Sequence, residues 1–129
     1  MVSVLLLSHS YKLAQGLKEL CEQMAPSVNI EFSGGTEDGE IGSNFDQISE
    51  KINKLTEDSN YLIVFFDLGS SMMNAQMAIE MLDEDKKKRV KLADSPIVEE
   101  AIQTTVMLEG GTSFKEMCDF LDERKFNKL

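Results

Sequence analysis

Residues 61–66 read Tyr61-Leu62-Ile63-Val64-Phe65-Phe66, a run of apolar side chains rich in β-branched and aromatic residues. A run that is apolar on both faces predicts a strand in the middle of a parallel sheet, covered by helices on both sides. The turn residues Asp67-Leu68-Gly69-Ser70 follow it directly. This stretch places the chain in the α/β class.

Strand and helix patterns alternate on both sides of this run. Further strands are predicted at residues 2–7, 28–32 and 90–92. Helices are predicted at about 11–25, from Phe45 to Leu55, at about 72–82, from Pro96 onward with Ser95 as its N-cap, and at about 113–124. Alternating strands and helices indicate a parallel sheet with right-handed crossovers. We therefore predict one domain over residues 1–129, a three-layer α/β/α fold around a central, mainly parallel sheet.

Apolar residues at helical spacing predict which helix faces enter the core. In the helix at 11–25, the predicted inner face is Leu13, Leu17, Leu20 and Met24. In the helix at 72–82, Met77 and Met81 are predicted to pack in the core. Met72 and Met73 lie in its first turn and are expected at the surface.

Charge and composition exclude several classes of function. The chain has 23 acidic and 13 basic residues and a formal net charge of −10, which argues against binding nucleic acid or an anionic membrane. The apolar N-terminal run is too short to span a membrane and lacks the features of a secretory signal. We expect a cytoplasmic protein with reduced Cys21 and Cys118 and no metal site, because no ligand set has the spacing of a zinc or calcium site.

The chain contains one histidine, His9, directly after the first strand. Because the carboxyl ends of parallel strands share one edge, His9 is expected near Gly34-Gly35, Asp67 and the turn after residue 92. Imidazole is the side chain whose unperturbed pKa lies between about pH 5 and 8. The alternative is a histidine without chemistry, packed in the core or at the surface.

Helix amino ends and glycine-rich turns at this edge offer N–H groups to anions. An imidazole beside such groups predicts a histidine that carries a phosphoryl group, with Asp67 orienting the ring. The predicted phosphoryl-binding residues are Ser10, Gly34, Gly35, Gly69 and Ser70. Asp67 could instead be a turn or capping residue, and the glycine-rich stretch a flexible connection.

The acidic residues Glu37, Asp38 and Glu40 of that stretch would repel a bare phosphate, and the stretch matches no nucleotide-binding fingerprint. Methionine side chains adapt to several partners. We therefore predict that Met72, Met73 and Asn74, near the start of their helix, dock partner proteins.

Several motifs together carry a resemblance that covers nearly the whole chain. They are Leu7-Ser8-His9-Ser10, the loop from Gly34 to Ser43, Phe66-Asp67-Leu68-Gly69-Ser70, residues 73–80, and Ser95-Pro96-Ile97-Val98-Glu99. They resemble the mannose-type EIIA domains of the bacterial phosphotransferase system. More closely, they resemble the subunit M family of phosphoenolpyruvate-dependent dihydroxyacetone kinase. The chain departs from the family pattern at Glu100, where a glycine is usual, and at Ser71, where alanine is usual.

This resemblance implies a phosphotransferase in which His9 accepts a phosphoryl group from the carrier protein HPr. It implies transfer to ADP held in subunit L of the kinase, a role for Asp67 in the active site, no tightly bound cofactor, and a homodimer. The expected absence of fused carrier domains implies that separate proteins supply the phosphoryl group. Two alternatives remain: a sugar-transport EIIA that passes phosphate to an EIIB protein, and a non-catalytic binding module on the same fold.

Overall fold

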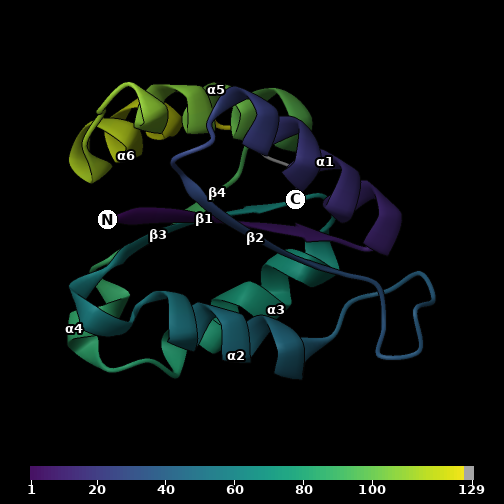
Figure 1. Cartoon of the computed structure of the whole chain (residues 1–129). Coiled ribbons are helices and arrows are strands. Elements are labelled where there is room, and N and C mark those ends of the chain that lie inside the picture. Colours follow the sequence, from purple (N-terminus) through teal and green to yellow (C-terminus); the bar gives the residue numbers. More distant parts are fainter. Residues whose placement is uncertain (127–129) are drawn as a thin grey trace.

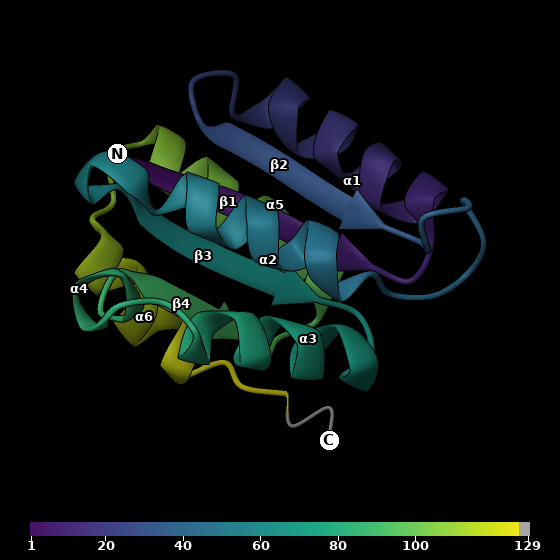
Figure 2. The same cartoon turned by 90° about the horizontal axis from the view of Figure 1, so that it is seen from below.

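Four parallel strands form the centre of the computed structural model, which describes residues 1–126. They are β1 (Val2–Ser8), β2 (Asn29–Gly34), β3 (Tyr61–Phe66) and β4 (Val90–Ala93), in the spatial order β2-β1-β3-β4 (Figure 2). Each neighbouring pair is parallel, with Leu7 opposite both Ser33 and Phe66. All carboxyl ends therefore lie at one edge of the sheet.

Helices cover both faces of this sheet (Figure 1). One layer contains α1 (Tyr11–Met24), α5 (Ile97–Glu109) and α6 (Phe114–Asp122), and the other contains α2 (Phe45–Leu55) and α3 (Gly69–Glu80). A 3-10 turn (Glu57–Ser59) precedes β3, and the short α4 (Glu84–Lys87) lies in the connection between α3 and β4. The three-layer α/β/α prediction is confirmed.

The alternation of side chains along β1 and β3 divides the interior into two cores. Val4, Leu6, Ile63 and Phe65 face the α1, α5 and α6 layer. Leu5, Leu7, Leu62, Val64 and Phe66 face the α2 and α3 layer. All nine are fully buried, and each such side chain stabilises the fold by roughly 1.5–3 kcal/mol.

The predicted inner face of α1 is wrong by part of a turn. The buried residues are Ala14, Leu17 and Cys21, whereas Leu13, Leu20 and Met24 are 43–50% exposed. The reason is close packing: a Cβ built on Gly34 would lie 3.1 Å from the Cβ of Ala14. A small side chain fits between α1 and Gly34 at this distance, and the larger Leu13 turns outward. Leu17, one turn further along, is buried as predicted.

The predicted faces of α3 also need correction. Met72 is buried with Ala75 and Ala78, although we expected it at the surface. Met77 and Met81 are 55% and 72% exposed, although we expected them in the core. Here too small residues occupy the inner face, because α3 packs closely on α2 and the sheet.

The predicted N-cap of α5 is wrong by one residue, whereas α6 begins with a complete capping box. Pro96, not Ser95, is the N-cap of α5, and Ser95 is buried. At α6, Ser113 and Glu116 form a reciprocal capping box. Glu100, the departure from the family pattern, is buried and pairs with Arg124, which follows α6.

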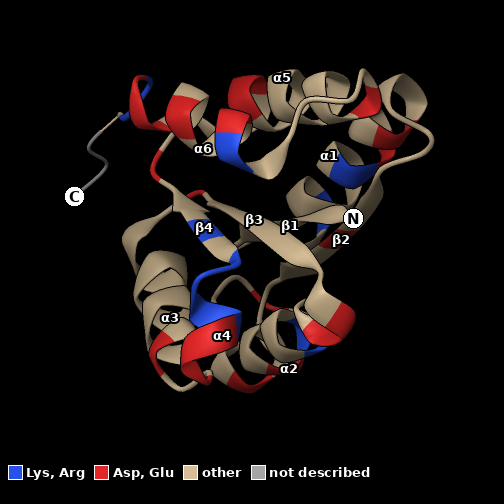
Figure 3. Cartoon of the chain, turned by 90° about the vertical axis from the view of Figure 1, so that its left-hand side faces the viewer, with Lys and Arg blue, Asp and Glu red and all other residues tan. Residues whose placement is uncertain are grey.

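Acidic residues lie on helices of both layers, with fewer basic residues between them (Figure 3). Within residues 1–126, no helix has both the length and the apolar character needed to cross a bilayer.

Candidate functional site

The crevice between the ends of β1 and β3 is the topological switch point of the sheet. From these neighbouring strands the chain continues into α1 on one face and α3 on the other (Figure 1). Such divergence opens a crevice where ligands bind in doubly wound folds. The residues that follow the two strands are His9 and Asp67, as the sequence predicts.

The imidazole of His9 is held by the carboxylate of Asp67. His9 Nδ1 lies 3.0 Å from Asp67 Oδ1, and the side chains of both residues are mostly buried. Ser71 Oγ lies 3.2 Å from the same nitrogen. A carboxylate only accepts hydrogen bonds when ionised, so this contact places the ring proton on Nδ1.

Asp67 is itself fixed by three backbone or hydroxyl donors. The Ser8 hydroxyl and the His9 amide donate to its Oδ2 at 2.8 and 3.0 Å, and the Leu68 amide donates to Oδ1 at 2.7 Å. Burial raises the pKa of Asp67, but the hydrogen bonds from His9, Ser8 and Leu68 outweigh it and hold the pKa below its ordinary value. The carboxylate is therefore ionised and aligned on the imidazole.

The other ring nitrogen, Nε2, faces the outer side of the crevice. It contacts the hydroxyl of Ser70, in the first turn of α3. With the proton on Nδ1, Nε2 carries the free lone pair. This nitrogen is the one available to a reacting group.

The first turn of α3 lies beside Nε2 without a side-chain cap. Its N-cap is Leu68, which makes no capping hydrogen bond, and Gly69 and Ser70 follow. First-turn amides have no partner within the helix and carry the positive end of the helix dipole. Of the predicted phosphoryl-binding residues, Gly69 and Ser70 thus lie in this uncapped first turn, and the Ser70 hydroxyl contacts the imidazole. Ser10 follows His9 directly and caps α1 by accepting from the Leu13 amide.

Gly34 and Gly35 have a packing role that the sequence did not reveal. A Cβ on Gly34 would lie 2.7 Å from Ser10 O and 2.8 Å from Tyr11 Cα, and Gly35 has a φ of +77°. The Gly35 amide donates to Ser8 O at 3.3 Å, so it is already bonded to β1. These glycines let the loop pass close to the start of α1. Their part in phosphoryl binding stays a prediction.

Three site residues were missed by sequence reasoning. Ser8 and Ser71 contact Asp67 and His9 through their hydroxyls, and the Gly42 amide donates to the His9 carbonyl at 2.9 Å. Ser8 had a positional signal, since it ends β1 beside His9. Gly42 had none, because its contact depends on how the loop after β2 folds back.

The predicted docking residues separate in the structure. Met73 is 65% exposed, whereas Met72 belongs to the core beneath α3. The Asn74 side-chain amide donates to Ser43 Oγ at 2.8 Å and so ties α3 to the end of the loop after β2.

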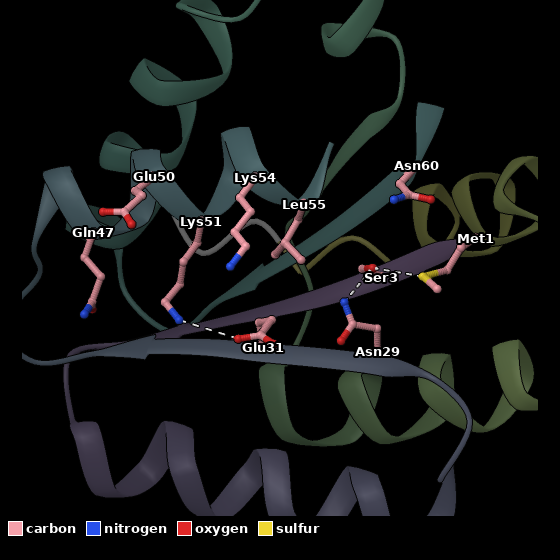
Figure 4. Close-up of a pocket in the computed structure, with 10 residues that line it drawn as sticks. All are labelled: Met1, Ser3, Asn29, Glu31, Gln47, Glu50, Lys51, Lys54, Leu55 and Asn60. Carbon is pink, nitrogen blue, oxygen red and sulfur yellow. Dashed lines mark hydrogen bonds and ion pairs between the residues drawn. The ribbon is translucent and has the colours of Figure 1, made fainter. Parts of the chain in front are cut away.

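A separate groove of about 500 Å³ lies between α2 and the amino-terminal halves of β1 and β2 (Figure 4). Within it, Lys51 pairs with Glu31, and Asn29 donates to Ser3. The groove does not include His9 or Asp67. The candidate site is therefore the switch-point crevice, where the ionised carboxylate and the imidazole meet. Residues 1–126 contain no cluster of three or more His, Cys, Asp or Glu able to hold a metal ion.

Fold and site together define a doubly wound α/β domain with a carboxylate-oriented histidine, and comparison with known proteins identifies its family. The EIIA-man family, described as the fructose IIA component of the PTS system, matches residues 3–118. The chain belongs to this family.

Its relatives include named phosphoryl donor subunits. It is 34% identical over 125 residues to the phosphotransferase subunit DhaM of the PTS-dependent dihydroxyacetone kinase of Lactococcus lactis, covering 97% of both chains. It is 39% identical over 106 residues to the phosphoryl donor subunit DhaM of PEP-dependent dihydroxyacetone kinase 1 of Listeria innocua, covering 82% of this chain and 81% of that one. The crystal structure of a protein of unknown function is similar at a TM-score of 0.82 and 35% identity, over 92% of this chain and 90% of the other.

Proposed function

We propose that the chain is a phosphohistidine carrier that accepts a phosphoryl group on His9 Nε2 and passes it on within a PEP-dependent dihydroxyacetone kinase. The donor in this proposal is HPr, and the acceptor is ADP bound to the L subunit of the kinase. The observation that carries it is the Nδ1 contact with ionised Asp67, which leaves Nε2 unprotonated at the outer side of the crevice, where it contacts Ser70. The DhaM relatives support the choice of kinase system.

The first transfer is an exchange between two nitrogen nucleophiles. The Nε2 lone pair of neutral His9 forms a bond to phosphorus as the phosphorus–nitrogen bond of the donor phosphohistidine breaks, and the donor imidazole takes the electron pair. His9 becomes positively charged on its ring. Asp67, already ionised and 3.0 Å from Nδ1, stabilises this charge.

The second transfer reverses the roles at phosphorus. A β-phosphate oxygen of ADP forms the new bond, the Nε2–phosphorus bond breaks, and His9 returns to the neutral form with its proton on Nδ1. No tightly bound cofactor takes part. In this proposal the amides of Gly69 and Ser70, in the uncapped first turn of α3, bind the phosphoryl oxygens between the two steps.

Ser70 has to move during the cycle, because its hydroxyl occupies the position in front of Nε2. Rotation about its side-chain bond takes the hydroxyl off the nitrogen. The same hydroxyl can then donate to a phosphoryl oxygen. Ser70 would thus cover the nucleophile in the free state and bind the phosphoryl group in the loaded state.

The proposed relay is tested by labelling with phosphoenolpyruvate, enzyme I and HPr, followed by addition of an acceptor. Loss of label to the L subunit with ADP supports the kinase reading. Loss of label only to an EIIB protein would favour a sugar-transport EIIA. Since HPr and the kinase subunits are cytoplasmic in this proposal, we place the chain in the same compartment.

We also propose that the chain forms a homodimer. The edge strand β4 and the adjacent side of α3 support this, because Met77 and Met81 are exposed on α3 and two grooves of about 310 and 450 Å³, both lined by Gln76 and Leu92, lie along this edge. Exposed apolar side chains that gather on one surface are often covered by a partner chain. Sedimentation of the wild-type chain should show a dimer. M77E should be a monomer, and the control L20E on α1 should remain a dimer. A dimeric M77E chain would contradict an interface at this edge.

A further inference from the structure

The Ser71 hydroxyl lies inside the protein, against the inner nitrogen of the His9 ring. Its Oγ is 3.2 Å from His9 Nδ1, and the residue is only 1% exposed. Within residues 1–126 this nitrogen is the only hydrogen-bonding partner of the hydroxyl. Buried hydroxyl groups normally have such a partner, because leaving them without one is costly. The imidazole is therefore the group that satisfies Ser71.

The first turn of α3 brings Ser71 to this position. The helix begins at Gly69, and the Ser71 amide donates to Leu68 O at 3.2 Å. Ser70, the preceding residue, contacts Nε2 on the outer side of the crevice. Consecutive residues thus place one hydroxyl at each nitrogen of the His9 ring. Ser70 is on the side of the reacting nitrogen, whereas Ser71 contacts the ring on the opposite side.

Two acceptors face the proton on Nδ1 of His9. Asp67 Oδ1 is 3.0 Å from this nitrogen, and Ser71 Oγ is 3.2 Å from it. A hydroxyl oxygen has two lone pairs, so it can accept from Nδ1 while the carboxylate does so too. Such three-centre hydrogen bonds, with one N–H between two acceptors, are common in proteins. Asp67 supplies the negative charge, and Ser71 supplies a second, neutral acceptor.

We propose that Ser71 is a positioning residue that favours the phosphorylated state of His9. The inference rests on the proposed function, in which the ring becomes positively charged when Nε2 binds the phosphoryl group. The ring gains or loses no proton in this step, so Nδ1 donates to Ser71 before and after it. A hydrogen bond from a charged donor is stronger than one from a neutral donor. The contact with Ser71 therefore strengthens on phosphorylation, and this difference shifts the equilibrium toward the loaded chain.

The test measures the equilibrium of phosphoryl transfer between HPr and the chain. Phosphorylated HPr is mixed with the chain in the absence of an acceptor, and the intact masses of both proteins at neutral pH give their phosphorylated fractions. For S71A we expect the equilibrium constant to fall about three- to tenfold, because the charged ring loses one of its two acceptors. S71C should show a similar fall, since a thiol is a weak acceptor.

The burial of Ser71 gives a second, kinetic readout. A residue that is 1% exposed does not contact HPr, so S71A should lower kcat and leave KM for phosphorylated HPr within about twofold of wild type. S95A is the matched control, because Ser95 is another buried serine, and its hydroxyl has no hydrogen-bond partner among the described residues. Ser95 follows β4 rather than β3, and S95A should leave the equilibrium constant and kcat unchanged.

The outcomes separate the role of Ser71 from the proposed function. A folded S71A or S71C chain with the wild-type equilibrium constant would overturn the role of Ser71 and leave the carrier function in place. An equal shift in S95A, or a loss in S71A that lies only in KM, would overturn it as well, since neither follows from a hydrogen bond to the ring. A folded wild-type chain that HPr does not label would overturn the proposed function, and the role of Ser71 with it.

Discussion

Replacing Asp67 with asparagine tests how the imidazole is oriented. The carboxylate accepts from Ser8 Oγ, the His9 amide, His9 Nδ1 and the Leu68 amide. An asparagine keeps the shape but has one acceptor and one donor group. Either way round, its NH₂ group faces a backbone N–H, that of His9 or that of Leu68.

The expected loss follows from these contacts. A hydrogen bond to a charged group contributes about 1.5–3 kcal/mol against about 0.5–1.5 for a neutral one, and an unsatisfied buried donor costs about 1–3 kcal/mol. We expect D67N to lose about 2–4 kcal/mol of transition-state stabilisation, which slows phosphoryl transfer about 30- to 900-fold. If the NH₂ group faces Nδ1, it also moves the ring proton to Nε2 and blocks the nucleophile.

The assay follows the mass of the intact protein with time after phosphorylated HPr is added. D94N alters another carboxylate at the carboxyl-terminal edge of the sheet, after β4, and serves as the control. Circular dichroism verifies that D67N is folded. A folded D67N chain that is labelled at the wild-type rate would refute the orienting role of Asp67.

Three further predictions concern stability and the phosphoryl site. G34A should destabilise the fold by about 1–3 kcal/mol, because its Cβ would meet backbone atoms of Ser10 and Tyr11. G16A, with nothing within 4 Å in exposed α1, should instead stabilise it by about 0.5–1 kcal/mol, and urea unfolding distinguishes the two. S70A should slow transfer from HPr about two- to tenfold, because the phosphoryl group loses one hydrogen bond. A transfer rate above that of wild type would indicate that the Ser70 hydroxyl only obstructs Nε2. The folded-state pKa of Asp67 is lowered below the ordinary 3.8, so its stabilising contribution is complete at neutral pH and is lost as the pH falls through the folded-state pKa. The free energy of unfolding, measured with urea between pH 7 and 3, should therefore fall more steeply for wild type than for D67N. Parallel curves would contradict a stabilising role of the Asp67 carboxylate.

Sequence patterns predicted the parts of the fold that depend on long apolar runs and strand order. The run at 61–66 is β3 with unchanged bounds, and the parallel arrangement brings His9 beside Asp67. Both residues directly follow neighbouring strands, so topology alone places them together. This is why His9 and Asp67 could be predicted from the sequence as neighbours at one edge of the sheet.

Helix faces were predicted less well because spacing does not say how close a helix lies to its sheet. Ala14 and Cys21 face inward on α1, and Met72 rather than Met77 does so on α3. In both helices small residues share the inner face with one large apolar residue, Leu17 on α1 and Met72 on α3, and the other large apolar side chains are exposed. The hydrogen bond from Gly42 to His9 depends on a folded-back loop, which periodicity cannot describe.

The most direct test of the account is the intact mass of the chain after incubation with phosphoenolpyruvate, enzyme I and HPr, measured at neutral pH beside H9A. The account predicts the addition of one acid-labile phosphoryl group to the wild-type chain and none to folded H9A. An unchanged mass in the presence of active HPr, or a phosphoryl group that H9A still accepts, would contradict it.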